Sequence, residues 1–556
     1  MNIWPPVLRG YQRGWLRGDL VAGITVAAYL VPQVMAYASV ARLSPVTGLW
    51  AALPALVIYA FLGTSSSLSL GPEATTALMT AIALGPLAAG NTGRYVSLAA
   101  TLALLTGLFA VVAWILRLGF VADLLSRPVL IGYMAGLALI MIADQLGRVT
   151  GVPVTGQVFR SQVGYFFTHL ELVQGTTIIL SCSVVVFLLL VRWHWPHAPG
   201  PLIAVLISTA LVVLAGLSSH GIHVVGRIPA ALPTPSLPVF RPSTLKELLL
   251  PAFAVLIVGF SDDVLTARSF ARRGETIVPN RELLAFGVAN GSASLVHGFP
   301  VSSSATRTSI AVASGSRTQI YSLVTAAAVV VVLLFARPVL AYFPTAALGA
   351  IVIYAALQLI EVAAFRRLLR FRRTELAIAL ATCAGVLALN ILYGVLVAIG
   401  LSVADLLVRV ARPHDAILGF VPGLAGMHDV DDYAEARTVP GLVVYRYDAP
   451  LCFANAENFR RRALAAADQQ ENRLRWFVLN VEANVEVDFT ALEALDTLRT
   501  QVNGRGAEFA LARVKQDLLA QLSAFGLAEK IGPERLFPTL PTAVAAYRAW
   551  SELHPA

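Results

Sequence analysis

The sequence predicts a polytopic α-helical membrane protein that ends in a small α/β domain. The chain of 556 residues is 57% hydrophobic and 13% charged, whereas about 25% of the residues of a soluble domain are charged. Long apolar runs fill the first 412 residues, and most of the Asp and Glu residues follow Arg412. A soluble globule could not bury so much apolar surface, so a lipid bilayer is the expected solvent for residues 1–412.

Apolar runs without acidic or basic residues predict the membrane-spanning helices. A spanning helix needs about 20 mostly apolar residues, and such runs cover 20–41, 43–72, 74–93, 95–116, 172–191, 318–336, 338–360 and 376–404. Further runs lie at 128–143, 193–226, 248–261 and 283–306. Cutting the longer runs at Pro and Gly predicts roughly twelve to fourteen helices, several of them too short to cross fully.

Arginines between the apolar runs are interpreted as loop anchors. Arg117 and Arg127 flank one short loop, Arg192 ends another helix, and the group at 366–373 is the densest. Placing these clusters inside satisfies the positive-inside rule with an even number of spans. We therefore expect a multi-pass protein of the plasma membrane, the inner membrane in bacteria, with both termini cytoplasmic. The net charge of +9 then needs no nucleic-acid partner.

Residues 413–556 predict a small cytoplasmic α/β domain, after a transmembrane domain at 1–412. The runs LVVYRY (442–447) and RWFVLNV (475–481) are typical of buried strands. Residues 455–470 and 490–506 have the spacing of amphipathic helices, and glycines at 504 and 506 suit the end of the second. Strand and helix alternate, as in an α/β domain.

Two short segments predict helices that begin inside the membrane. In residues 67–84, Gly71 and Pro72 precede an apolar run, and Pro is favoured at the first helical position. In residues 298–314, Pro300 is followed by three serines whose hydroxyls can cap a helix. Helix N-termini attract anions, and interrupted helices in two halves indicate a transporter site. The alternative is that these residues only kink two spans.

Arg307 argues against that alternative. It lies about one turn into the second of these segments, between apolar stretches. A charged side chain inside a membrane segment usually faces a cavity and marks a functional site. Arg307 is therefore expected to add a full positive charge to the helix N-terminus.

Acidic and amide side chains supply further candidate groups. Asp262 and Thr266 are four residues apart and share a helix face, while Asp263 points elsewhere. One intramembrane carboxylate can hold a proton or a cation, although both aspartates could instead be solvated at a membrane edge. Gln33 follows Pro32 in the first span, and Tyr37 lies on the same face; a kinked helix with a satisfied Gln is the alternative.

Metal, redox and catalytic motifs are missing from the sequence. The three cysteines lie far apart and show neither a disulfide framework nor a zinc spacing. The motifs His-Glu-x-x-His and Gly-x-Ser-x-Gly do not occur. We therefore expect no cofactor, no metal and no enzymatic activity.

Several segments together resemble the sulfate permease family of anion transporters. The signature-like stretch runs from Gly18 to Trp50 and has the expected residues at Asp19, Gly23, Pro32, Gln33, Met35, Ala36, Tyr37 and Pro45. The resemblance continues through LGPEA (70–74), TARSFA (266–271), FPVSSSATRTS (299–309) and the tail, which resembles a STAS domain. STAS domains are related to anti-sigma-factor antagonists, in which a phosphorylatable Ser follows an Asp. In this sequence Thr490 lies near the corresponding position, after Asp488.

The resemblance implies a fold of fourteen segments in two inverted repeats of seven, as in uracil transporters. The half-helices then correspond to residues 72–88 and 303–314. The implied substrate-binding positions are Gln33, Tyr37, Glu73, Ala74, Ser303, Ser304, Thr306 and Arg307. Asp262 takes the place of the family's acidic residue. Thr266 matches a position that helps bind sodium in a bicarbonate-transporting branch and is expected to contact a cation or the substrate.

Two positions refine the implied function. Arg307 is basic in many anion-transporting members and absent from the sodium-dependent branch, which favours a carrier without sodium coupling. Glu73 stands where the family usually has an apolar residue. It could pair with Arg307 in the empty site or bind a proton that enters with the substrate.

The resemblance therefore implies a secondary active transporter of a small oxyanion, with sulfate first and proton coupling through Asp262 or Glu73. A core of segments one to four and eight to eleven would move as an elevator, and the STAS domain would support a homodimer. The alternatives are transport of bicarbonate or a dicarboxylate, anion exchange, channel-like conduction, and a sensor whose tail binds a partner.

Overall fold

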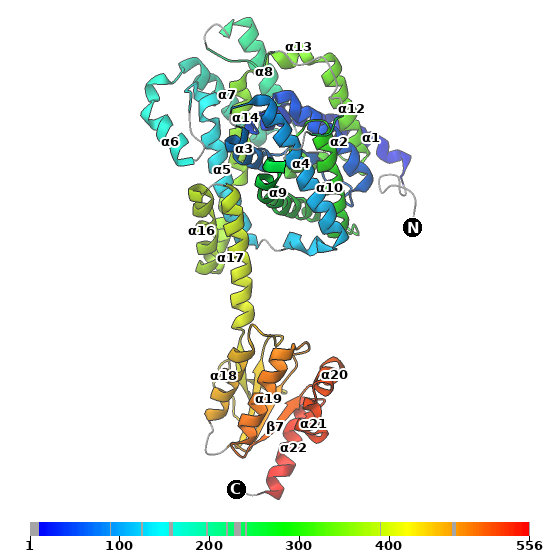
Figure 1. Ribbon diagram of the computed structural model, residues 1–556, viewed down its shortest axis with the longest axis vertical. Coiled ribbons are helices and arrows are strands. Elements are labelled where there is room, and N and C mark those ends of the chain that lie inside the picture. The colour runs from blue at the N-terminus through cyan, green and yellow to red at the C-terminus, as the bar shows by residue number, and fades with distance from the viewer. Residues whose placement is uncertain are drawn as a thin grey trace. The chain divides into compact units, whose positions relative to one another are not determined.

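The computed structural model describes residues 11–88, 90–123, 126–154, 159–195, 198–217, 221–226, 235–238, 242–389, 391–469 and 474–554. The chain divides into two compact units, Met1–Ser402 and Val403–Ala556 (Figure 1). The division lies within α17 (Ile391–Ala411), and the boundary expected after residue 412 follows the end of this helix.

Helices make up almost all of the first unit. The longer ones in the first half are α1 (Leu16–Val40), α2 (Pro45–Leu62), α3 (Ala74–Ala88), α4 (Thr92–Ile115), α5 (Arg127–Thr150), α6 (Phe159–Thr168), α7 (Gly175–His194) and α8 (Gly200–Leu214). The second half contains α9 (Pro242–Ser269), α10 (Pro279–Leu295), α11 (Ala305–Ala313), α12 (Ile320–Phe335), α13 (Arg337–Ala341), α14 (Thr345–Leu359), α15 (Val362–Phe371), α16 (Arg373–Leu389) and α17.

Helix length separates full spans from partial ones. Seven helices of the described residues are long and apolar enough to cross a membrane, namely those within 13–40, 45–62, 92–115, 127–150, 175–194, 245–269 and 345–371. The apolar helices α3, α8 and α12 are shorter. The predicted series of helices is therefore a mixture of full-length and partial spans, as the short apolar runs indicated.

The two halves of this unit repeat the same packing. Helix α1 packs against α12 and α11, and correspondingly α9 packs against α4 and α3. Helix α4 packs against α10, as α12 does against α2. In the rest of the unit α5 packs on α16 and α7 on α14, while α5 and α14 contact each other. These matched pairs relate α1–α4 to α9–α12, which is the arrangement of an inverted-repeat transporter.

A short antiparallel ladder lies where the repeats meet. Strand β1 (Leu70–Gly71) pairs with β2 (Ser302–Ser303), with Leu70 opposite Ser303 and Gly71 opposite Ser302. Each strand directly precedes a short helix, α3 or α11. The ladder satisfies backbone groups that would otherwise be unpaired where the helices are interrupted.

Small residues let the central helices approach closely. A Cβ placed on Gly107 of α4 would lie 2.6 Å from the carbonyl oxygen of Gly287 in α10. A Cβ placed on Gly287 would lie 2.9 Å from the carbonyl oxygen of Gly107. Close backbone contact through small residues is typical of helices packed within membranes.

The second unit is an α/β domain, as predicted. Its six-stranded sheet has the order β4-β3-β5-β6-β7-β8, formed by β3 (Asp415–Phe420), β4 (Met427–Asp429), β5 (Leu442–Tyr447), β6 (Trp476–Asn480), β7 (Glu508–Ala512) and β8 (Leu536–Phe537). Strands β5 to β8 are parallel, and β3 is antiparallel to its neighbours. The helices are α18 (Ala456–Asp468), α19 (Phe489–Asn503), α20 (Gln516–Ala524), α21 (Leu527–Ile531) and α22 (Leu540–Leu553).

Candidate functional site

The N-termini of α3 and α11 lie beside the β1–β2 ladder. Helix α11 begins after Ser304, whose hydroxyl accepts a hydrogen bond from the backbone N–H of Arg307 at 3.4 Å. Helix α3 begins at Ala74, two residues later than expected, so Pro72 precedes the helix. Glu73 caps it instead, because its Oε2 accepts a hydrogen bond from the backbone N–H of Thr75 at 2.7 Å. A carboxylate at a helix N-terminus is well matched to the dipole.

Arg307 is fully buried between these two helix starts. Its Nη1 donates to the carbonyl oxygen of Pro72 at 3.1 Å and to Gln33 Oε1 at 3.3 Å, and its Nε donates to Ser69 Oγ at 3.3 Å. Its Nη2 has no hydrogen-bond partner, and no ion pair is formed with Arg307 by any residue that the structure describes. A buried charge without an ion-pair partner is costly, and a charged side chain of this kind is suited to holding an anion.

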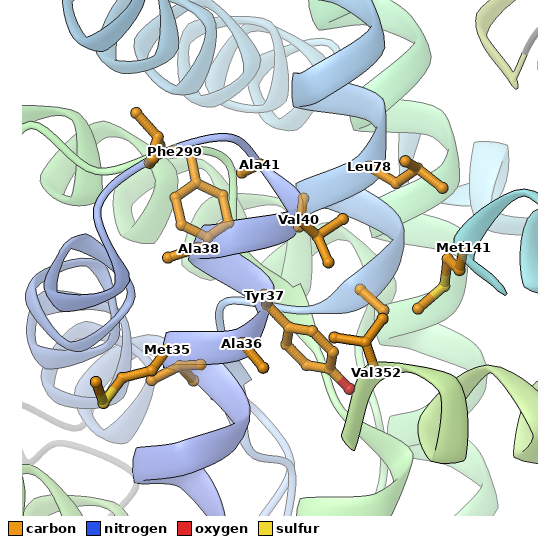
Figure 2. Close-up of a cluster of buried hydrophobic side chains, with 14 of the residues drawn as sticks. Met35, Ala36, Tyr37, Ala38, Val40, Ala41, Leu78, Met141, Phe299 and Val352 are labelled. Atoms are coloured by element: carbon orange, nitrogen blue, oxygen red, sulfur yellow. The ribbon is translucent and has the colours of Figure 1, made fainter. Parts of the chain in front are cut away.

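Gln33 and Tyr37 extend this polar group along α1. Gln33 Nε2 donates to the hydroxyl of Tyr37 at 3.0 Å, and both side chains are buried. In Figure 2 the Tyr37 ring points away from α1 toward Val352 of α14. The i, i+4 spacing thus places the amide on Arg307 and the phenol next to the opposite helix, within an apolar cluster.

The adjacent aspartates of α9 hold β2 in different ways. Asp263 is 1% exposed and its Oδ1 accepts a hydrogen bond from the backbone N–H of Ser303 at 2.5 Å. Asp262 Oδ2 accepts from the Ser303 hydroxyl at 3.4 Å and remains partly exposed. Both carboxylates therefore lie inside the protein near the ladder, and the alternative of two solvated aspartates at a membrane edge is wrong.

A cavity of about 340 Å³, here called the central cavity, lies against these elements. Six of the predicted site residues line it: Tyr37, Glu73, Ala74, Asp262, Thr266 and Thr306. Four others, Gln33, Ser303, Ser304 and Arg307, do not line it and lie buried behind the helix starts. Asp262 and Thr266 do share the face of α9 that meets the cavity, and Asp263 does not.

The central cavity is also lined by two arginines that the sequence predicts as anchors of loops. Arg127 at the start of α5 and Arg192 near the end of α7 both line it, together with Gln358 and Glu361. These arginines were interpreted as loop anchors only. Their convergence depends on the packing of α5, α7 and α14, so the sole sequence signal was a basic residue at a helix end.

The pairing of Glu73 with Arg307, considered as one state of the empty site, is not formed here. Glu73 is partly exposed at the cavity and is held by the Thr75 N–H. The central cavity thus presents two carboxylates, from Glu73 and Asp262, in front of a buried guanidinium. Such an arrangement can bind an anion when a carboxylate is neutralised by a proton or when its side chain turns away from the site.

The described residues contain no cluster of three or more His, Cys, Asp or Glu side chains that could hold a metal ion. In the α/β unit, Thr490 is exposed in the first turn of α19, and the N-cap Asp488 accepts from the backbone N–H of Ala491 at 2.8 Å.

Comparison with known proteins gives consistent matches over the whole chain. The model of the sulfate permease family matches residues 16–382, and the STAS domain model matches residues 433–543. A probable sulfate transporter of Mycobacterium tuberculosis is 58% identical over 550 residues, which cover 98% of each chain. Sulfate transporter 3.2 of Arabidopsis thaliana is 29% identical over 567 residues, which cover 97% of this chain and 87% of that protein.

Solved structures share the fold. The murine anion transporter Slc26a9 in its inward-facing state has a TM-score of 0.90 at 22% identity, covering 98% of this chain and 94% of that one. The transmembrane domain of the cyanobacterial bicarbonate transporter BicA has a TM-score of 0.60 at 24% identity, covering 71% of this chain and 98% of that one. At these identities the likeness concerns the fold alone, and it confirms the predicted inverted-repeat membrane domain with a STAS tail.

Proposed function

Because the chain belongs to the sulfate permease family, we propose that it is a secondary active transporter that carries sulfate across the membrane together with protons. The membrane fold and the names of its relatives support anion transport as the general activity. The observation that carries the proposal is the buried Arg307 guanidinium, which has one unpartnered nitrogen between two helix N-termini.

The substrate site is assigned to the starts of α3 and α11. Backbone N–H groups at Ala74 and Thr306 and the positive ends of two helix dipoles favour a small oxyanion. Arg307 supplies the full charge, and Gln33, which itself donates to Tyr37, orients the guanidinium. Ser304 caps α11 and Ser303 donates to Asp262, and both are assigned to orient the anion together with Tyr37. Ala74 and Thr306 line the cavity, whereas Arg307 is buried behind them, so the anion meets the two helix starts before it meets the guanidinium.

Proton coupling is assigned to Asp262 or Glu73. Both carboxylates line the cavity that the anion enters, so a divalent anion is repelled until at least one of them is protonated. Thr266 lies on the same wall and is the remaining candidate contact for a cation or the substrate. The resemblance implies that a basic residue at the Arg307 position is absent from the sodium-dependent branch, which argues for a carrier that does not need sodium.

An elevator motion would carry this site across the bilayer. The moving core would be α1–α4 with α9–α12, and the remaining membrane helices would form the gate. We place both termini and the STAS domain in the cytoplasm of a plasma-membrane protein, the STAS domain supporting a homodimer and regulating transport.

Purified protein in proteoliposomes tests the proposal. Labelled sulfate should accumulate when the outside is acidified, and unlabelled sulfate should compete better than bicarbonate, fumarate or chloride. Current that flows without a proton gradient would indicate channel-like conduction, and uptake that needs an anion inside would indicate exchange. A full-length chain that moves none of these anions would support the sensor alternative and contradict the proposal.

A further inference from the structure

A second cavity lies at the other end of the helices that line the central cavity. It has a volume of about 670 Å³, and its lining includes Arg42, Asp144, Arg148, Gln174 and Thr345. Helix α5 contributes residues between Arg127 and Met134 to the central cavity, and its last turns contribute Asp144, Gly147 and Arg148 to the second one. A helix of this length spans about 36 Å, enough to cross the hydrocarbon core of a bilayer, which is about 30 Å thick.

Two further helices show the same division. The end of α7 contributes Arg192 to the central cavity, while Gln174 and Thr177 at its start line the second cavity. The end of α14 contributes Gln358 to the central cavity, while Thr345 at its start lines the second one. Three packed helices thus connect the two cavities, which lie at opposite ends of these helices.

Arg148 closes the gap between α5 and α1 at this cavity. Its Nη2 donates to the carbonyl oxygen of Ser39 at 2.6 Å, and its Nη1 donates to Gln145 Oε1 at 3.0 Å. The nearby Asp144 does not pair with Arg148 in the described structure. Its carboxylate accepts hydrogen bonds from Gln145 Nε2 at 3.1 Å and Gln162 Nε2 at 3.4 Å. Asp144 therefore lies close to Arg148 without forming a direct ion pair with it, and among the described residues the Arg148 guanidinium bonds only to neutral groups.

Arg42 has an unfavourable backbone conformation at the same cavity. Its φ of 58° is in the left-handed region, where the chain leaves α1 with Arg42 N–H bonded to Ser39 O at 3.1 Å and Leu43 N–H bonded to Ala38 O at 2.9 Å. Glycine is the usual residue at this position after a helix, because a Cβ is strained there. The arginine side chain is exposed and lines the cavity, so the strained position presents a second positive charge to it.

We infer that the second cavity is a capture site for the transported oxyanion, with Arg42 and Arg148 as its binding residues. The inference rests on the proposed transport function and extends it to a residue pair outside the central site. Two arginines and one aspartate leave the lining net positive, which concentrates small anions at a cleft. In the proposed elevator motion α1 moves relative to α5, which breaks the hydrogen bond from Arg148 to Ser39. The free guanidinium can then bind the anion before it reaches the central cavity.

The experiment measures the half-saturating sulfate concentration separately at each face of the membrane. Proteoliposomes are sorted by whether added protease reaches the STAS domain, and sulfate uptake is followed in each population. For Arg42→Gly we expect a rise of about threefold to tenfold in the half-saturating sulfate concentration at one face only, and no change at the other face. The unfolding midpoint should equal or exceed that of the wild type, because glycine relieves the strained conformation.

Arg148→Gln should show a rise at the same face, and Arg148→Lys should show a smaller one, because lysine keeps the charge. Arg94→Gln is the matched control. Arg94 is exposed at the start of α4 and does not line the cavity, while the adjacent Tyr95 hydroxyl donates to Ala41 O at 2.8 Å, which places it at the same end of α1. The half-saturating sulfate concentration of Arg94→Gln should match that of the wild type at both faces.

Equal values for wild type and Arg42→Gly at both faces would overturn the capture site. A shift at both faces, or an equal shift in Arg94→Gln, would also overturn it, since a general charge effect would then explain the result. Wild-type vesicles that take up no sulfate would overturn the proposed function and this inference together. The two failures are therefore distinguishable.

Discussion

Arg307 and Gln33 are joined by a hydrogen bond of 3.3 Å from Nη1 to Oε1, across helices that come from different repeats. Gln33 in turn donates to Tyr37, whose side chain reaches the central cavity. The buried charge is thus connected to the cavity wall through two neutral side chains. A change in what Arg307 binds can therefore alter the position of Tyr37, whose ring lies next to Val352 of α14 (Figure 2).

Uptake of sulfate should rise as the external pH falls and should not change when sodium is replaced by potassium. Two carboxylates line the cavity, and neutralising one of them removes repulsion of a divalent anion. Initial rates in proteoliposomes between pH 5.5 and 8 provide the measurement. Uptake at neutral pH that stops without sodium would contradict the proposal of a carrier without sodium coupling.

Asp262→Asn should keep exchange of sulfate between equal pools and lose accumulation driven by a proton gradient. The asparagine preserves the size of the side chain and can still accept a hydrogen bond from the Ser303 hydroxyl, so β2 should stay in place. Counterflow and uphill uptake are measured on the same vesicles. Accumulation that is unchanged from the wild type would move the coupling residue to Glu73 or beyond the cavity.

Glu73→Gln should bind sulfate more tightly, or over a wider pH range, while concentrative uptake weakens. The substitution removes a negative charge at the start of α3 and retains a side-chain oxygen for the Thr75 N–H. Equilibrium binding as a function of pH checks this result. If this variant alone is uncoupled, Glu73 carries the proton and Asp262 has a structural role.

Asp263→Ala should lower stability far more than Asp262→Ala. Asp263 is buried and accepts the backbone N–H of Ser303, so its loss leaves that donor unpaired at a cost of about 1–3 kcal/mol. Thermal unfolding of the detergent-purified variants distinguishes these neighbours. Equal unfolding midpoints would contradict the different roles assigned to the two aspartates.

Local sequence signals predicted the interrupted helices and the polar residues on them. Gly71–Pro72 and the serines before Arg307 indicated the breaks, and the i, i+4 rule correctly grouped Asp262 with Thr266. The sequence predicts the start of α3 two residues too early, because Glu73 caps the N-terminus of the helix and Pro72 lies before it.

Residues brought together by tertiary packing were not predictable in this way. Arg127 and Arg192 are 65 positions apart and reach the central cavity only through the packing of α5, α7 and α14. The sequence indicated only that Asp263 points away from the Asp262 face, because its partner is a backbone N–H forty residues away. The burial of Arg307 behind the cavity wall likewise depends on Ser69 and Pro72 in the other repeat.

The central claim is that Arg307 holds the transported oxyanion, and equilibrium binding of labelled sulfate to the purified protein tests it most directly. Arg307→Ala should weaken binding about tenfold to a hundredfold, because a charge-assisted contact contributes about 1.5–3 kcal/mol. The sulfate affinity of Arg307→Lys should lie between those of the wild type and Arg307→Ala, since lysine keeps the charge but lacks the planar array of N–H donors. Unfolding midpoints should show that both variants are folded. A folded Arg307→Ala variant that binds sulfate with wild-type affinity would contradict the account.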